Sequence, residues 1–151
     1  PISSAVAADQ KGLVVIFLSA KCPCSNSHNG ELKSLAHDFP QFQFVGVHSN
    51  GDEPHAKAYF EKIELPFRVI EDKNFALANQ FKALKTPHAF VFDSTGKILY
   101  QGGVSDSRKL ERADKKLLRA ALSDIEAGHP VAIAQGRTLG CEISRGEKHV
   151  W

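Results

Sequence analysis

The feature that most constrains the fold is the uninterrupted apolar run Leu-Val-Val-Ile-Phe-Leu at 13–18. Such a run, rich in β-branched residues, is typical of a strand that is buried on both faces. A helical pattern begins at Pro23 and ends before Pro40, with apolar side chains at spacings of four and three. The apolar stripe of this helix consists of Cys24, His28, Leu32, Leu35 and Phe39. We therefore expect a buried strand that turns into a helix close to Cys22 and Cys24.

The rest of the chain alternates between strand and helix patterns. The expected elements are a short helix at 2–10, a strand at 42–48, a helix opened by Asp52-Glu53-Pro54, a strand at 67–70, a helix capped by Asp72, a hairpin at 89–100 and an amphipathic helix at 110–125. This order predicts an α/β fold with a central mixed sheet flanked by helices. We expect one domain over 1–128 and an irregular tail over 129–151 that packs on it.

Charge and composition exclude some classes of partner. The 19 basic and 17 acidic residues leave a net charge of +2, which gives no basis for binding nucleic acid or an anionic membrane. No apolar run approaches the length of a transmembrane helix. Methionine is absent even at position 1, so a removed secretory signal and a cut at a domain edge both fit. We expect a monomer, and we favour an extracytoplasmic compartment, such as a bacterial periplasm.

The three cysteines, Cys22, Cys24 and Cys141, are too few for a disulfide scaffold. Cys22 falls where the first strand turns into a helix, and the unsatisfied N–H groups of a helix N-terminus favour a thiolate. Lys21 adds a cation one residue upstream. We therefore expect Cys22 to be the reactive thiol.

Cys24 is open to two interpretations. Two residues along a helix correspond to a rotation of about 200°, so its sulfur is expected to point away from that of Cys22. Cys24 also lies on the apolar stripe, so a packing role and a redox role are both open. Ser25 occupies the position where a second cysteine would share the face of Cys22. A Cys22–Cys24 disulfide would be strained and easily reduced.

Two segments carry a resemblance to a known family. Phe17-Leu-Ser-Ala-Lys-Cys22-Pro-Cys-Ser25 resembles the active-site segment of the thioredoxin-like redoxins, and Thr86-Pro87 resembles the cis-proline loop that faces the cysteine in that fold. The tail Pro130-Val-Ala-Ile…Gly140-Cys141-Glu-Ile143 is similar to a peroxiredoxin-like branch of the alkyl hydroperoxide reductase/thiol-specific antioxidant superfamily. The resemblance covers residues 11–143. The chain departs from it at Lys21, where thioredoxins carry Trp, and in lacking the N-terminal strands that are common in the superfamily.

This resemblance implies a thioredoxin-like fold and thiol–disulfide exchange through Cys22, with protein or small-molecule thiols and disulfides as partners and no cofactor. Thr86 and Pro87 would face the thiol, and Ser19, Lys21 and Ser25 would support it. With Ser25 in the usual resolving position, a second thiol is needed from Cys141, from glutathione or from a partner protein. Cys141 could instead pack against the domain. We expect mild oxidation to form Cys22–Cys141 or Cys24–Cys141 in a fraction of molecules.

Two other functions remain as alternatives. A peroxiredoxin acting on hydroperoxides needs Ser or Thr three residues before its cysteine, an upstream Pro and an Arg. Ser19 meets the first requirement, but Val15 and Pro87 occupy the other two positions. The second alternative is a soft-metal site, in which Cys22, Cys24 and His88 bind Cu(I) as in copper-delivery proteins of this fold. Those proteins use Cys-x-x-x-Cys, whereas this chain has Cys-x-Cys, so Cys22, Cys24 and His88 are candidates only and no metal is assigned.

Overall fold

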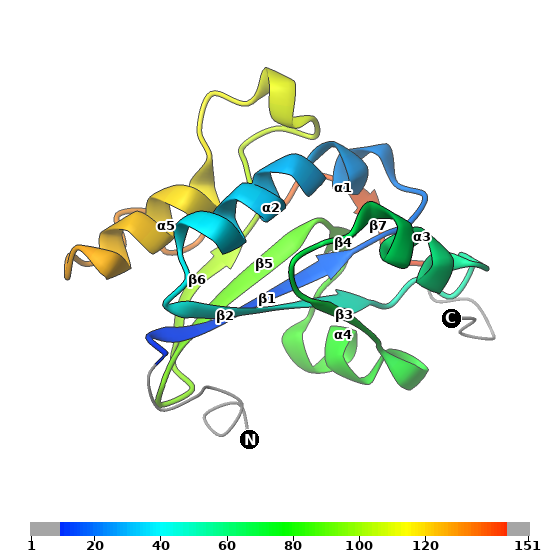
Figure 1. Ribbon diagram of the computed structural model, residues 1–151, viewed down its shortest axis with the longest axis horizontal. Helices are drawn as coiled ribbons and strands as arrows, with labels where there is room; N and C mark the ends of the chain where they lie inside the picture. The colour runs from blue at the N-terminus through cyan, green and yellow to red at the C-terminus, as the bar shows by residue number, and fades with distance from the viewer. Residues whose placement is uncertain (1–9, 145–151) are drawn as a thin grey trace.

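The computed structural model describes residues 10–144 and contains a central five-stranded sheet (Figure 1). Its strands lie in the order β3-β2-β1-β5-β6. They comprise β1 (Gly12–Leu18), β2 (Phe42–His48), β3 (Arg68–Glu71), β5 (His88–Asp93) and β6 (Ile98–Gly102). β1, β2 and β3 are parallel, whereas β5 and β6 run antiparallel to their neighbours. The predicted mixed α/β sheet is confirmed; the helix expected at 2–10 lies, except for Gln10, outside the described residues.

Helices cover both faces of the sheet. They are α1 (Pro23–Ser27), α2 (Asn29–Asp38), α3 (Ala56–Ile63), α4 (Ala76–Phe81) and α5 (Leu117–Glu126), with short 3-10 turns η2 (Lys73–Phe75) and η3 (Leu110–Arg112). α2 and α5 lie side by side over one face, and α4 covers the other (Figure 1). The core has two layers, one on each face of the sheet, because successive side chains of the buried strand β1 point to opposite faces. Val14, Ile16 and Leu18 pack in the core beneath α2 and α5, whereas Leu13, Val15 and Phe17 pack towards α4.

One ion-pair cluster joins α2 to α5. Arg119 donates from Nε and Nη2 to the carboxylate of Glu31, at 3.2 and 3.0 Å, and from Nη1 to Asp38 at 2.8 Å. Glu31 is buried, so this two-pronged contact supplies the counter-charge that a desolvated carboxylate requires. No helix within residues 10–144 is both long and apolar enough to cross a membrane.

The single helix expected from Pro23 to Phe39 is divided at His28, which corrects the prediction. The His28 ring is buried, and its Nδ1 donates to the carbonyl oxygen of Cys24 at 2.7 Å. That carbonyl would otherwise accept the backbone N–H of His28, which bonds to Ser25 at 3.1 Å instead. The side chain thus competes with the helical hydrogen bond and tightens the turn between α1 and α2.

Two further helices begin later than expected. The helix predicted from Asp52 begins at Ala56, because His55 adopts a left-handed conformation (φ 67°) and Glu53 turns inward to bond the end of β1. The helix predicted from Leu110 begins at Leu117. Ahead of it the chain forms η3 and a closed loop, in which the Asp114 N–H donates to the Asp106 side chain at 2.9 Å.

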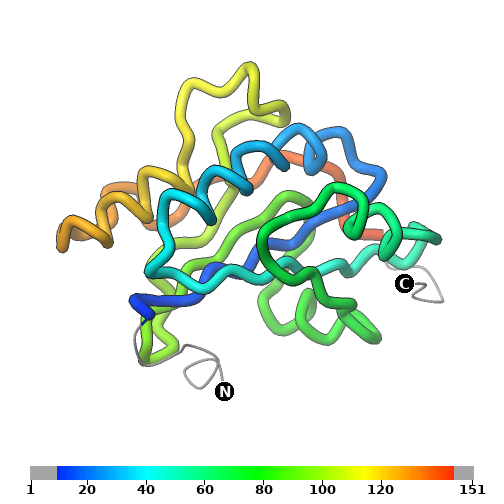
Figure 2. The backbone as a smooth tube through the Cα atoms, in the orientation of Figure 1, coloured from blue at the N-terminus to red at the C-terminus, as the bar shows by residue number. Residues whose placement is uncertain are grey.

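The tail after α5 is irregular but makes specific backbone contacts. It runs back across the molecule to the turn that follows β1 (Figure 2). Gln101 on β6 exchanges hydrogen bonds with Ala134 and Gly136, and β7 (Cys141–Glu142) pairs antiparallel with β4 (Lys85–Thr86). A Cβ at Gly140 would lie 1.9 Å from the Thr86 oxygen, so only glycine permits this approach. The backbone contacts of the tail therefore place Cys141 close to the end of β1.

Candidate functional site

Three sulfur atoms meet where β1 turns into α1. Cys22 is the N-cap of α1, and the pairing of Thr86 with Cys141 places the tail cysteine beside it. Cys22 and Cys141 form a disulfide, with their Cα atoms 6.1 Å apart, and Cys24 is a free thiol. The Sγ atoms of all three cysteines lie within 4.8 Å of one another. The site thus combines one disulfide and one adjacent thiol.

The expected orientation of Cys24 is wrong. The prediction applied helical rotation between Cys22 and Cys24, but Cys22 has an extended backbone (φ −74°, ψ 118°) and precedes the helix. The rotation of 100° per residue does not apply across that boundary, so the two sulfurs come close. Cys24 is half-buried, and its sulfur lies in the same group as the disulfide.

The loop between β4 and β5 lies against the disulfide. The peptide between Thr86 and Pro87 is cis, and the carbonyl oxygen of Thr86 lies 3.8 Å from Sγ of Cys22. Thr86 is buried, and the same residue pairs through its backbone with Cys141. Thr86 therefore contacts both halves of the disulfide.

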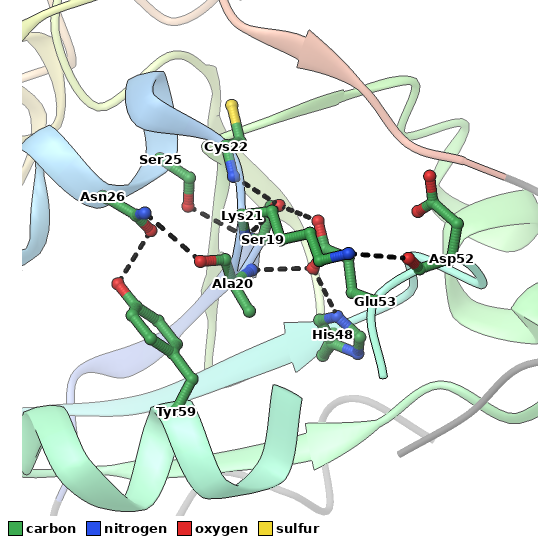
Figure 3. Close-up of polar contacts among 10 residues, drawn as sticks. All are labelled: Ser19, Ala20, Lys21, Cys22, Ser25, Asn26, His48, Asp52, Glu53 and Tyr59. Atoms are coloured by element: carbon green, nitrogen blue, oxygen red, sulfur yellow. Dashed lines mark hydrogen bonds and ion pairs between the residues drawn. The ribbon is translucent and has the colours of Figure 1, made fainter. Parts of the chain in front are cut away.

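A buried polar network supports the turn that carries Cys22 (Figure 3). The Ser19 hydroxyl accepts the backbone N–H of Cys22 at 3.0 Å and donates to the carboxylate of Glu53. Glu53 also accepts the N–H of Ala20 at 2.7 Å and Nε2–H of His48 at 2.8 Å. The Cys22 sulfur points away from this network (Figure 3). The network therefore fixes the backbone of the turn, while the sulfur faces the tail.

Glu53 is a buried carboxylate that no sequence motif indicated. Burial raises its pKa, but the hydrogen bonds from His48, Ser19 and Ala20 outweigh that effect, and the net pKa is lowered. Glu53 is therefore ionised at neutral pH. The strand order offers one signal for Glu53. Because β1 and β2 are parallel, the residues that follow them, Ser19 and Glu53 among them, meet at the same edge of the sheet.

Ser25 and Lys21, which were predicted to support Cys22, have different roles in the structure. The buried Ser25 hydroxyl accepts the Ser19 N–H at 3.0 Å, so Ser25 braces the turn from the helix side. Asn26 donates to the Ala20 carbonyl at 3.2 Å and accepts from the Tyr59 hydroxyl at 2.7 Å. The exposed Lys21 ammonium lies 3.4 Å from the carbonyl oxygen of Asp52. Figure 3 shows that Lys21 extends towards Asp52, away from the sulfur of Cys22.

A shallow pocket of about 220 Å³ gives access to the disulfide. Its lining residues are Ser19, Lys21, Cys22, Pro23, Asn50, Asp52, Glu53, Cys141, Glu142 and Ser144. Among the residues that the structure describes, the lining contains three carboxylates and a single basic side chain, that of Lys21. The approach to the sulfurs is therefore more favourable for cations than for anions.

Comparison with known proteins decides the family. The family model described as Redoxin matches residues 2–117. The chain belongs to the Redoxin family. No match was found among curated protein sequences.

Solved structures share the fold of this redoxin. An uncharacterized conserved protein from Geobacillus kaustophilus is 29% identical, with a TM-score of 0.83 over 96% of this chain and 82% of that one. A hypothetical protein from Sinorhizobium meliloti is 24% identical, with a TM-score of 0.79 over 92% and 82% of the two chains. A secreted disulfide oxidoreductase from Mycobacterium tuberculosis is 22% identical, with a TM-score of 0.53 over 60% and 69%. A thioredoxin-like protein in the oxidised form is 18% identical, with a TM-score of 0.69 over 85% of each chain, and this likeness confirms the thioredoxin-like fold.

Of the three residues predicted for a soft-metal site, His88 does not lie with the two cysteines. The His88 ring stacks on Phe90 with centroids 4.3 Å apart, and burial lowers the pKa of His88 to about 4. His88 does not join the group of three sulfurs, in which Cys141 takes the place predicted for the imidazole. Val15 is buried within β1, and Pro87 stands where a peroxiredoxin arginine was sought.

Proposed function

We propose that this redoxin is a thiol–disulfide oxidoreductase in which Cys22 exchanges disulfides with protein or small-molecule thiols. The observation that carries the proposal is the Cys22–Cys141 disulfide, with the Cys24 sulfur in the same group. A second cysteine brought from 119 residues away completes the pair that the motif alone lacks.

The proposed reaction has two steps. In the reduced protein, the Cys22 thiolate attacks a substrate disulfide, forms a mixed disulfide and releases one substrate thiolate. The Cys141 thiolate then attacks Sγ of Cys22, and the second substrate thiolate leaves. Two electrons pass from the protein to the substrate, and the Cys22–Cys141 bond forms. The reverse sequence oxidises a substrate dithiol.

Contacts that do not involve sulfur support Cys141 as the resolving thiol. The Ile143 N–H donates to the Leu84 carbonyl at 2.7 Å, and the Ile143 side chain is buried against the domain. The Gly51 N–H donates to Ser144 at 2.8 Å. These contacts tether the tail after the disulfide is reduced, so Cys141 stays near Cys22 at a high effective concentration.

Glu53 is proposed as a positioning residue. It holds both the Ser19 hydroxyl and the Ala20 N–H, and Ser19 in turn binds the N–H of Cys22. These bonds orient the turn in either redox state, because none of them uses the sulfur.

Exchange is favoured over peroxide reduction by the charges at the pocket. A peroxidase site stabilises negative charge that develops on peroxide oxygen, and a positioned arginine usually provides this. Here the lining offers Lys21, whose ammonium lies at the Asp52 carbonyl, together with three carboxylates. That arrangement provides little electrostatic stabilisation for negative charge on a peroxide oxygen.

We further propose that the protein acts outside the cytoplasm. Disulfides persist in oxidising compartments, and this one lies at a surface pocket within reach of cellular thiols. The structurally similar mycobacterial oxidoreductase is described as secreted, which agrees with this proposal.

The test compares single Cys→Ser variants in the reduction of a protein disulfide, such as that of insulin, with dithiothreitol as electron donor. We expect Cys22→Ser to lose the catalysed rate and Cys24→Ser to keep most of it. When reduced Cys141→Ser is mixed with insulin after dithiothreitol has been removed, we expect it to retain a mixed disulfide on Cys22. Hydrogen peroxide consumption is measured on the same preparations. An unchanged rate in Cys22→Ser, or peroxide turnover far above that of a free thiolate, would contradict the proposal.

A further inference from the structure

We propose that the fully reduced protein binds one Cu(I) ion through the sulfurs of Cys22, Cys24 and Cys141. This inference does not depend on the proposed exchange activity, because it concerns the state in which all three thiols are free. It also uses a different ligand set from the His88-containing one that the sequence suggested.

The geometry of the sulfur group suits a three-coordinate ion. All three Sγ atoms lie within 4.8 Å of one another. Three sulfurs bound to one ion at about 2.3 Å in a trigonal arrangement lie about 4.0 Å apart. The Cys24 sulfur already lies within 4.8 Å of the other two, whereas the sulfurs of Cys22 and Cys141 are bonded to each other. Reduction breaks that bond, and side-chain rotation must then separate these two sulfurs to about twice the length of a disulfide bond.

The backbone holds the three ligands in place without help from a metal. Cys22 is fixed by the bond from its N–H to Ser19, and Cys141 by the pairing of β7 with β4. The Cys24 carbonyl accepts from Nδ1 of His28 at 2.7 Å, which holds the first turn of α1. A site on supported backbone loses less conformational entropy when the ion binds.

The donor set selects the metal. Thiolates are soft ligands that favour Cu(I) and Zn²⁺, and structural Zn²⁺ is almost always held by four protein ligands. Among residues 10–144, no carboxylate, imidazole or fourth cysteine joins the three sulfurs. A three-sulfur set without a fourth ligand therefore fits Cu(I) better. The carboxylates that line the pocket also favour the approach of a cation.

Binding is coupled to the redox state of the protein. A dithiol reductant transfers two electrons and two protons to the Cys22–Cys141 disulfide and is itself oxidised to a disulfide. Cu(I) then displaces the three thiol protons and remains monovalent. Formation of the Cys22–Cys141 bond removes two of the three ligands, so the oxidised protein cannot hold the ion. Copper and the disulfide are mutually exclusive occupants of these sulfurs.

The experiment titrates reduced protein, freed of dithiothreitol under anaerobic conditions, with Cu(I) supplied as its bicinchoninate complex. We expect the full chain to remove one equivalent of Cu(I), and the oxidised chain to remove none. The decisive variant is Cys24→Ser, because Cys24 is outside the disulfide and half-buried, and serine is close to cysteine in size. Loss of a direct ligand should weaken binding by more than about 100-fold, the upper range for losing an outer-shell partner.

X-ray absorption at the copper edge supplies the second readout. We expect three sulfur neighbours in the wild type and two in Cys24→Ser, while His88→Asn serves as the matched control with unchanged stoichiometry and affinity. The proposal is overturned if reduced wild type fails to compete for Cu(I), or if Cys24→Ser matches the wild type in affinity and sulfur number. Tighter retention of Zn²⁺ than of Cu(I) in a parallel titration would contradict the choice of metal.

Discussion

Replacing Glu53 with Gln tests whether the buried carboxylate holds the turn beneath Cys22. The carboxylate accepts three hydrogen bonds, from the Ser19 hydroxyl, the Ala20 N–H and Nε2–H of His48. An amide of the same shape has one accepting oxygen, which can serve Ala20 and His48. Its NH₂ group would face Ser19, whose hydroxyl hydrogen would then lose its acceptor.

The size of the effect follows from these contacts. A hydrogen bond to a charged group contributes roughly 1.5–3 kcal/mol, so losing the Ser19 bond should cost about 2 kcal/mol of unfolding free energy in Glu53→Gln. Glu53→Ala leaves three buried donors without their acceptor and should cost on the order of 4 kcal/mol. Glu142→Gln is the matched control, because Glu142 lines the same pocket but is exposed. It should change stability by less than about 0.5 kcal/mol.

The stability difference between wild type and Glu53→Gln should depend on pH. The pKa of Glu53 is lower in the folded chain than in the unfolded chain, so the unfolded chain binds more protons in acid. The stability contributed by ionised Glu53 is present above its unfolded pKa, and it is lost as pH falls through the folded value. The difference between wild type and Glu53→Gln should therefore shrink below about pH 4.

Urea denaturation of the oxidised proteins at pH 7 and in acid measures both effects. A Glu53→Gln protein as stable as the wild type at pH 7 would refute the reasoning. A stability difference that stays constant in acid would show that the charge of Glu53 is not its source.

Three further predictions follow from single contacts. Gly140→Ala should clash with the Thr86 oxygen and lower the fraction of Cys22–Cys141 disulfide in a fixed glutathione buffer, while Gly30→Ala, with no atom near the new Cβ, should not. Arg119→Met should destabilise the chain by about 2 kcal/mol in urea, because it leaves a buried carboxylate on α2 without its partner. Since burial lowers the pKa of His88 to about 4, the unfolded chain binds the extra proton between about pH 6.5 and 4. Wild type should therefore lose stability in that range relative to His88→Phe, by roughly 1–3 kcal/mol.

The sequence predicts the sheet well, because a buried strand appears as a short run of apolar residues and a hairpin as a turn motif. The apolar run at 13–18 and the hairpin around Asp93–Gly96 lie in the structure as β1 and β5–β6. Helix boundaries are predicted less well. They depend on side chains such as His28 and Glu53, whose partners are distant in sequence or compete with the backbone.

The site can be predicted only in part from the sequence, because it too depends on contacts between residues that are distant in sequence. Cys22 and Cys141 are both found as candidates, but the path of the tail depends on backbone pairing with β4, which leaves no periodic pattern. Cys24 is misplaced because its direction depends on the residue at which α1 begins. Glu53 is missed because only the parallel pairing of β1 and β2 brings it under Ser19.

Disulfide mapping tests whether Cys22 and Cys141 form the working redox pair. Reduced protein is equilibrated with glutathione buffers of rising potential, free thiols are alkylated, and peptides are mapped without reduction. We expect two thiols to be lost together, a Cys22–Cys141 linkage and an alkylated Cys24. A Cys22–Cys24 linkage, or glutathione on Cys22 with Cys141 still alkylated, would contradict it.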